Sequence, residues 1–164
     1  MPLILPTLQS ELIDVYNKGK KGNPFPAAVG HKTGKAYVNY VSAGMNAGGG
    51  SFTSMPGGVP LGGDLAEVLS KVPTASGMIT ATNIAKAVDK CLATFLSVHQ
   101  TTIVTAAGLP GLISELVDLL SKANASATLF CQGLATAVNN HAMSAIVSGM
   151  IPGAPPVPFT GPIS

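Results

Sequence analysis

The stretch Gly30–Ala36, GHKTGKA, has the residue types and nearly the spacing of a phosphate-binding loop. Such a loop reads G-x4-G-K-[ST] and follows a strand, so that backbone N–H groups and the lysine surround a phosphate. Here one residue between the glycines is missing, Ala36 stands in place of the hydroxyl residue, and the neighbouring residues recur at helical spacing. The sequence therefore predicts no nucleotide-binding site.

The three histidines, His31, His99 and His141, are the first candidates for metal or catalytic chemistry. No two of them have the spacing of ligands on one helix, and no Cys-x-x-Cys or His-x3-His pattern occurs. No G-x-S-x-G turn for a nucleophilic serine is present, and the few carboxylates lie near lysines rather than in pairs. We therefore expect no enzymatic activity, no metal and no cofactor, and a packing or capping role for His99 and His141.

The basic residues argue against a specific nucleic-acid partner. All nine are lysine, whereas bidentate recognition of phosphate or guanine relies on arginine. The formal net charge of +2 adds little attraction to a phosphate backbone. Lys18, Lys20 and Lys21, with Lys32 and Lys35, form a basic patch that we interpret as a solvated face.

The two cysteines, Cys91 and Cys131, each lie among apolar residues in the middle of an expected helix. This context predicts buried free thiols in a reducing compartment rather than a disulfide framework. Met1–Pro6 has no basic region and is interrupted by proline, so we expect no secretion signal.

The elements that would position these residues are repeated along the chain. LPTLQSELIDVYNK at Leu5–Lys18 matches LPGLISELVDLLSK at Leu109–Lys122. The triplet Leu-Ala-Thr at Leu92 recurs at Leu134, a shift of 42 residues (134 − 92), and a weaker copy of the short helix begins at Asp64. Self-similarity of this kind is typical of a supersecondary unit that cannot bury its apolar face alone.

We therefore expect an all-α fold, a bundle of about six helices in a single domain over residues 1–150. Three units would cover residues 5–45, 61–108 and 109–150, each with a short amphipathic helix followed by a longer apolar helix. Gly30 and Gly34 would weaken the first long helix, or permit close contact with another helix. The long helices are expected from Pro26 to Ala43, from Thr80 or Thr82 to Ala107, and from Asn124 or Ser126 to Met150.

Two segments fall outside this helical pattern. The Gly-rich segment 44–63 carries no charge, which indicates a mobile loop or a hairpin arm. The segment 151–164 is rich in proline and should form an extended, polyproline-like tail. We expect both to reach a neighbouring subunit, the tail as a strap. The candidate interface residues are Phe52, Met55, Val59, Leu61, Ile151, Pro155, Pro156, Val157, Phe159 and Ile163.

The composition supports assembly with other polypeptides. Hydrophobic residues make up 46% of the chain and charged residues only 10%, against roughly a quarter charged in a typical soluble protein. No charged residue occurs between Cys91 and Ser114 or after Lys122. Too few charges are present to cover a free monomer, so the surface should meet either neighbouring protein or lipid.

A family resemblance also indicates assembly with other polypeptides. The motifs Leu5-Pro6-x-Leu8 and Pro26-Ala27-Ala28, the tyrosines in Ala36-Tyr37-x-x-Tyr40, and the Pro-rich ending Gly149–Phe159 are similar to those of small helical virion proteins of contractile-tailed bacteriophages. The tryptophan that usually precedes the Ala-Tyr pair is absent. The resemblance implies a structural protein of the neck, tail or baseplate, made in the host cytoplasm. Its partners would be other copies of itself and other virion proteins.

The sequence leaves two alternative functions open. A membrane-active protein, holin-like or pore-forming, would place residues 91–107 and 127–150 as helices in lipid. Asn139, Asn140 and His141 would each cost free energy there, which favours assembly. A carrier of a small ligand would use the apolar interior of the bundle, and it would require a pocket with a few convergent polar groups.

Overall fold

The computed structural model describes residues 3–17, 25–53, 58–71, 76–97, 102–122 and 126–164. These residues are mostly helical, as the sequence predicts, and they also form five strands, of which only β1 falls in a segment where a hairpin was one of the expected alternatives. The helices are α1 (Leu5–Asn17), α2 (Pro26–Ser42), α3 (Gly58–Ser70), α4 (Gly77–Leu92), α5 (Leu109–Ser121) and α6 (Ala127–Met143). The strands are β1 (Phe52–Thr53), β2 (Leu96–Ser97), β3 (Thr102–Ala106), β4 (Ala145–Ile151) and β5 (Val157–Pro162).

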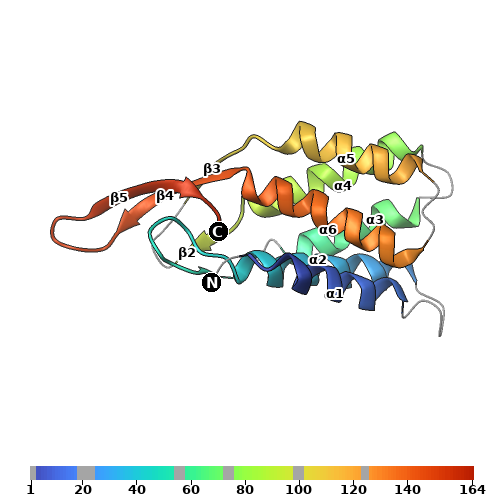
Figure 1. Cartoon of the computed structure of the whole chain (residues 1–164), viewed down its shortest axis with the longest axis horizontal. Coiled ribbons are helices and arrows are strands. Elements are labelled where there is room, and N and C mark those ends of the chain that lie inside the picture. The colour runs from blue at the N-terminus through green and yellow to red at the C-terminus, as the bar shows by residue number, and fades with distance from the viewer. Residues whose placement is uncertain (1–2, 18–24, 54–57, 72–75, 98–101, 123–125) are drawn as a thin grey trace.

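The helices form a closed ring at one end of the molecule, and the strands lie at the other end (Figure 1). Each helix packs against its neighbours in the chain, and α6 returns to pack against α1. At this closure the ring of Phe130 meets that of Tyr16 edge-on, with centroids 5.3 Å apart. The helices alternate in length: α1, α3 and α5 have 13 residues each, whereas α2, α4 and α6 have 17, 16 and 17.

Local sequence signals explain where several helices begin. Pro26 and Pro110 lie in the first turns of α2 and α5, where a missing N–H leaves no helical hydrogen bond unmade. The Ser126 hydroxyl caps α6 by accepting a hydrogen bond from the Leu129 backbone N–H at 3.2 Å, so the expected start at Ser126 is confirmed. For α4 the expected cap at Thr80 or Thr82 is wrong, because Ser76 caps this helix.

The close contact expected at Gly30 and Gly34 is confirmed. A Cβ at Gly30 would lie 2.3 Å from the backbone nitrogen of Ala66, and one at Gly34 would lie 2.9 Å from that of Gly62. Small residues four apart on α2 therefore face small residues four apart on α3, and the two backbones approach closely. The glycines that resembled a phosphate loop thus serve helix packing.

Three expected helix boundaries are wrong. α3 begins at Gly58 rather than Asp64, so part of the expected Gly-rich arm is helical. α4 ends at Leu92 instead of Ala107, where the Thr94 hydroxyl donates a hydrogen bond to the Cys91 carbonyl at 2.7 Å. The last helix ends at Met143, not Met150. The residues beyond these two long helices include the runs Thr-Ile-Val-Thr and Ile-Val, and β-branched residues favour strands over helices.

These residues build two antiparallel sheets. β1 pairs with β2, and β3, β4 and β5 form a three-stranded sheet in that order. Thr102 lies opposite Ser148 on β4, and Gly149 lies opposite Phe159 on β5. The expected polyproline-like conformation is therefore wrong for residues 157–162, because β5 pairs with β4 along its whole length.

The last residues return to the helical body. Ile163 is only 1% exposed, and the backbone N–H of Ser164 donates to the Met45 carbonyl at 3.0 Å. In return, the Met45 N–H donates to the Ser164 carbonyl at 2.7 Å. The end of the segment is thus held by its own chain rather than left to strap a neighbour.

Candidate interaction surface

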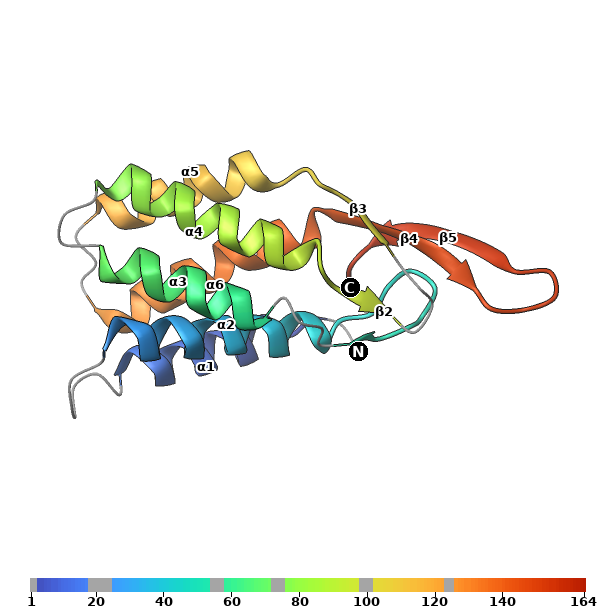
Figure 2. The same ribbon diagram turned by 180° about the vertical axis from the view of Figure 1, so that it is seen from behind.

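The feature that stands apart from the helical body is the hairpin of β4 and β5, which we call the ribbon (residues 145–162). Figure 2 shows it extending away from the helices, opposite the end at which α4 begins. The strands stay paired from Ile146, opposite Pro162, to Ile151, opposite Val157. In the described part of the chain, β3 accompanies β4 only as far as Ser148.

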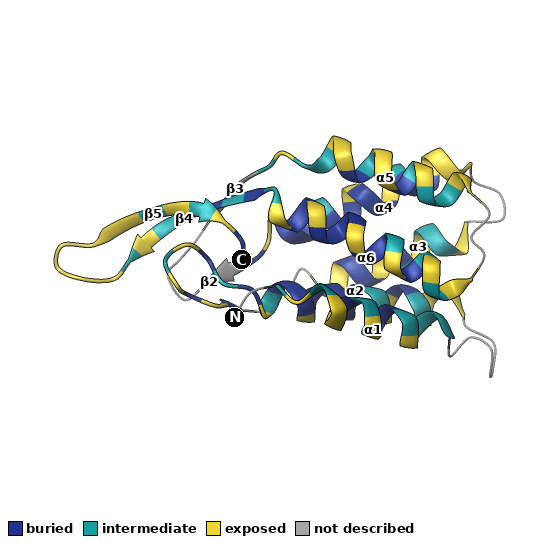
Figure 3. Ribbon diagram, viewed as in Figure 1, coloured by how far each residue is buried: buried dark blue, intermediate teal, exposed yellow. Residues whose placement is uncertain are grey.

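The ribbon exposes apolar surface without charge. Met150 is 46% exposed and Val157 is 54% exposed, and most of the ribbon is coloured as exposed in Figure 3. No charged residue occurs in the sequence after Lys122. Exposed strands of soluble proteins commonly carry lysine or proline, which discourage pairing with other chains. Here β5 carries Pro158 and Pro162, and neither strand carries a charge.

The ten candidate interface residues divide into four groups. The exposed ones are Val59 on α3 and, on the ribbon, Pro155, Pro156 and Val157. Ile151 and Phe159 are half-buried, and Phe159 packs against Gly48, where a Cβ would lie 2.8 Å from its ring. Met55 lies outside the described residues. The last group is buried in the protein's own core: Phe52, Leu61 and Ile163.

For the three buried residues, the expectation of an interface role is wrong because their side chains already pack inside this chain. Phe52 packs edge-on against Phe95, with ring centroids 6.4 Å apart, and Leu61 has no exposed surface. Met150, which was expected in a helix, is an exposed residue that the sequence prediction missed. The β-branched residues Ile146, Val147 and Ile151 were the available signal for a strand.

The charged side chains gather elsewhere on the molecule. A polar cleft between α3 and α4 is lined by Asp64, Glu67, Lys71, Lys86 and Lys90, among others. Lys71 pairs with Glu67, and Lys90 lies 3.8 Å from Asp64. These pairs are exposed, so each contributes little to stability. The cleft is best interpreted as a solvated face.

His141 has the packing role expected for it. Its side chain is buried on α6, and its Nε2 lies 2.9 Å from the Asp89 carboxylate on α4. Among the residues that the structure describes, no group of three or more His, Cys, Asp or Glu side chains could hold a metal ion. His99 lies outside the described residues, so the packing or capping role expected for it stays a prediction.

The thiols are free and buried, as predicted. Burial raises the pKa of Cys91 to about 12 and that of Cys131 to about 11, because the thiolate would lose its hydration. A nucleophilic cysteine needs the opposite shift, toward a lower pKa. Neither thiol is therefore prepared for catalysis.

Comparison with protein families, with curated proteins and with solved structures gives no match for this chain. The described helices also include none that is long and apolar enough to cross a membrane. The expected lipid-facing helix over residues 91–107 is wrong, because this range contains the end of α4 and strands β2 and β3.

Proposed function

We propose that the chain is a non-enzymatic structural protein that assembles in several copies, with the ribbon binding a neighbouring subunit. The observation that carries this proposal is the uncharged ribbon, which projects from the helical body and exposes Met150 and Val157. Full burial of one such side chain contributes about 1.5–3 kcal/mol. Several copies that each bury a ribbon would together supply the apolar contact of a stable assembly.

The proposed assembly is part of a virion: the neck, tail or baseplate of a contractile-tailed bacteriophage. Two sequence features support it, the resemblance of the N-terminal and Pro-rich motifs to such proteins and the low fraction of charged residues. The partners are then other copies of the chain and adjacent virion proteins. Mass-spectrometric detection of the chain in purified particles tests this location, and its absence from particles produced by the same genome would contradict it.

The role of the ribbon is tested by adding charge to it. The double variant Met150→Lys/Val157→Lys places two ammonium groups on exposed positions, where they leave the monomer intact but oppose burial in an interface. Met78→Lys is the matched control, because Met78 is 65% exposed on α4, away from the ribbon. Each protein is measured by sedimentation equilibrium over a range of concentrations.

We expect the unmodified chain and Met78→Lys to sediment at the same multiple of the 16.4 kDa chain mass. The ribbon variant should sediment as a monomer with an unchanged helical circular dichroism spectrum. Assembly of the ribbon variant to the same size as the unmodified chain would rule out the ribbon as the contact. A monomeric unmodified chain at all concentrations would count against self-assembly itself.

We infer further that the three helix pairs, α1–α2, α3–α4 and α5–α6, derive from one repeated unit. The alternation of helix lengths and the match between Leu5–Lys18 and Leu109–Lys122 support this origin. Superposition of the three pairs tests it. Pairs that fit one another no better than unrelated helical hairpins would contradict the repeat.

A further inference from the structure

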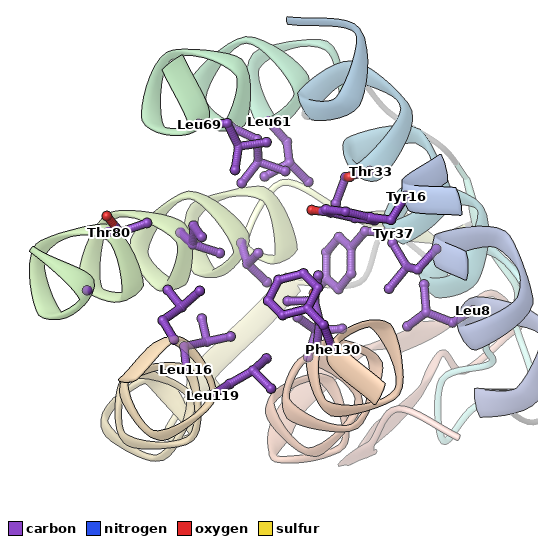
Figure 4. Close-up of a pocket in the computed structure, with 18 residues that line it drawn as sticks. Leu8, Tyr16, Thr33, Tyr37, Leu61, Leu69, Thr80, Leu116, Leu119 and Phe130 are labelled. Carbon is purple, nitrogen blue, oxygen red and sulfur yellow. The ribbon is translucent and has the colours of Figure 1, made fainter. Parts of the chain in front are cut away.

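The ring of helices encloses an apolar cavity of about 340 Å³. Figure 4 shows side chains from around the ring pointing into it. Protein interiors contain few voids larger than a water molecule, and an apolar cavity of roughly 150 Å³ is enough to bind benzene. The space here is therefore large enough for a bigger organic molecule. All six helices contribute lining residues, for example Leu12, Tyr37, Leu65, Ile84, Leu116 and Leu134.

One hydroxyl group on a residue that lines the cavity has no hydrogen-bond partner. It is Oη of Tyr37, which is buried. Tyr37 as a whole is only 3% exposed. A buried hydroxyl without a partner costs about 1–3 kcal/mol, and nearly all such groups in folded proteins are paired. A polar atom of a molecule bound in the cavity could supply the partner that the Tyr37 hydroxyl lacks.

The chemistry of the wall excludes a charged ligand. No charged residue lines the cavity among the residues that the structure describes. Burial raises the pKa of Tyr37 well above its ordinary value, and it also raises the pKa of Tyr16, partly offset by the Thr33 hydroxyl. The phenols therefore stay neutral. A carboxylate or phosphate would lose its hydration in this space without gaining a counter-ion.

We propose that the cavity binds one uncharged apolar molecule that carries a hydroxyl or carbonyl group, such as a medium-chain alcohol. The Tyr37 hydroxyl bonds to its polar atom, and the surrounding leucines contact its hydrocarbon. An apolar pocket with a precisely placed polar group is typical of small-molecule sites. The site is separate from the ribbon, and it does not depend on the assembly proposed above.

The lining residues also indicate the route of entry. Leu8 and Leu61 are fully buried, whereas Leu69 and Leu120 are half-buried and Gly77 is exposed. The exposed lining lies where α3 and α5 end and α4 begins, at the end of the ring opposite the ribbon (Figure 1). A ligand would enter from that end.

Binding is measured with N-phenyl-1-naphthylamine, an uncharged apolar fluorophore, followed by displacement with 1-decanol, decane and decanoate at pH 8. We expect saturable binding of one probe per chain. 1-Decanol should displace it at lower concentration than decane, and decanoate should displace it least. Absence of saturable probe binding, or displacement by decanoate as readily as by 1-decanol, would overturn the proposal.

Two pairs of variants locate the site. Val88→Phe fills the cavity, because Val88 lines it and is 3% exposed, whereas Val59→Phe adds the same atoms at a position that is 78% exposed. Tyr37→Phe removes the unpaired hydroxyl, whereas Tyr40→Phe removes a hydroxyl that donates to Asn139 outside the cavity.

We expect Val88→Phe to abolish probe binding and Val59→Phe to retain it. Tyr37→Phe should weaken 1-decanol about tenfold and leave decane unchanged, since one hydrogen bond is lost. Tyr40→Phe should affect neither. If Val88→Phe fails to fold, the two tyrosine variants still test the site. Equal weakening of 1-decanol binding by both would overturn the assignment of the polar contact.

Discussion

A Cβ at Gly30 would lie 2.3 Å from the backbone nitrogen of Ala66, closer than any non-bonded pair of these atoms can approach. α2 and α3 can therefore adopt their present spacing only if this position has no side chain. Gly30→Ala should lower the free energy of unfolding by about 1–3 kcal/mol or more, because the obstacle is backbone and cannot rotate away. Urea denaturation measures the change.

The control for this substitution is Gly63→Ala on α3. A Cβ at Gly63 would meet nothing within 4 Å, so only the helix propensity changes there. Replacing a helical glycine with alanine at such a position should raise the free energy of unfolding by about 0.5–1 kcal/mol. Equal destabilisation by the two substitutions would contradict the close contact of α2 with α3.

Tyr37 and Tyr40 lie one turn apart on α2, and loss of the hydroxyl should change the free energy of unfolding differently at the two positions. The Tyr40 hydroxyl donates to the Asn139 side chain on α6, and Tyr40→Phe should lower the free energy of unfolding by about 1–3 kcal/mol. The Tyr37 hydroxyl has no partner, so Tyr37→Phe should leave the stability unchanged or raise it. Urea denaturation of both variants without ligand provides the measurement, and similar losses for both would contradict it.

The contact between Asp89 and His141 should matter more than the exposed ion pairs. Asp89→Ala leaves the buried Nε2 of His141 without its partner, which should cost about 1–3 kcal/mol of unfolding free energy. Asp118→Ala removes a pair to Lys122 in which both side chains are more than 70% exposed, and it should cost under about 1 kcal/mol. Thermal and urea unfolding should rank the two variants in this order; the reverse order would contradict it.

Stability should fall at alkaline pH because of the buried thiols. The pKa values of Cys91 and Cys131 rise from 9.0 to about 12 and about 11 in the folded protein. Above about pH 9 the unfolded chain loses thiol protons that the folded chain keeps, so the free energy of unfolding decreases as pH rises. Below pH 9 this contribution is complete and constant.

Urea unfolding between pH 8 and pH 10 measures this slope, and Cys91→Ala/Cys131→Ala serves as the comparison. The double variant should show a smaller decrease over this interval, whatever its stability at pH 8. The thiols should also remain unreactive toward a disulfide reagent at pH 8 until urea unfolds the protein. Rapid labelling of the folded chain would show that the thiols are accessible.

The helices could be predicted because their signals are local. The apolar spacing in Leu5–Asn17 and Leu109–Ser121 and the cap at Ser126 lie within the elements that they specify. The strands could not be placed in this way. Thr102 pairs with Ser148 across 46 residues (148 − 102), and nothing in either stretch identifies the other. An isolated run of apolar residues is compatible with both a buried helix and a strand.

The interface candidates, too, depended on long-range packing that the local sequence does not reveal. Exposure depends on where a segment finally packs, so Ile163 and Val157 looked equivalent in the sequence although one is 1% and the other 54% exposed. The cavity was foreseen only as a requirement that a ligand carrier would have to meet. Its volume and the unpaired hydroxyl of Tyr37 depend on the arrangement of helices drawn from the whole chain.

The packing of α6 against α1 has a consequence for synthesis on the ribosome. α1 is translated long before α6, so the part of its apolar face that α6 covers stays exposed until α6 has been made. A premature stop before residue 127 leaves that part of the face exposed permanently. Such fragments should be prone to aggregation and rapidly degraded, whereas chains that include α6 can close the ring of helices.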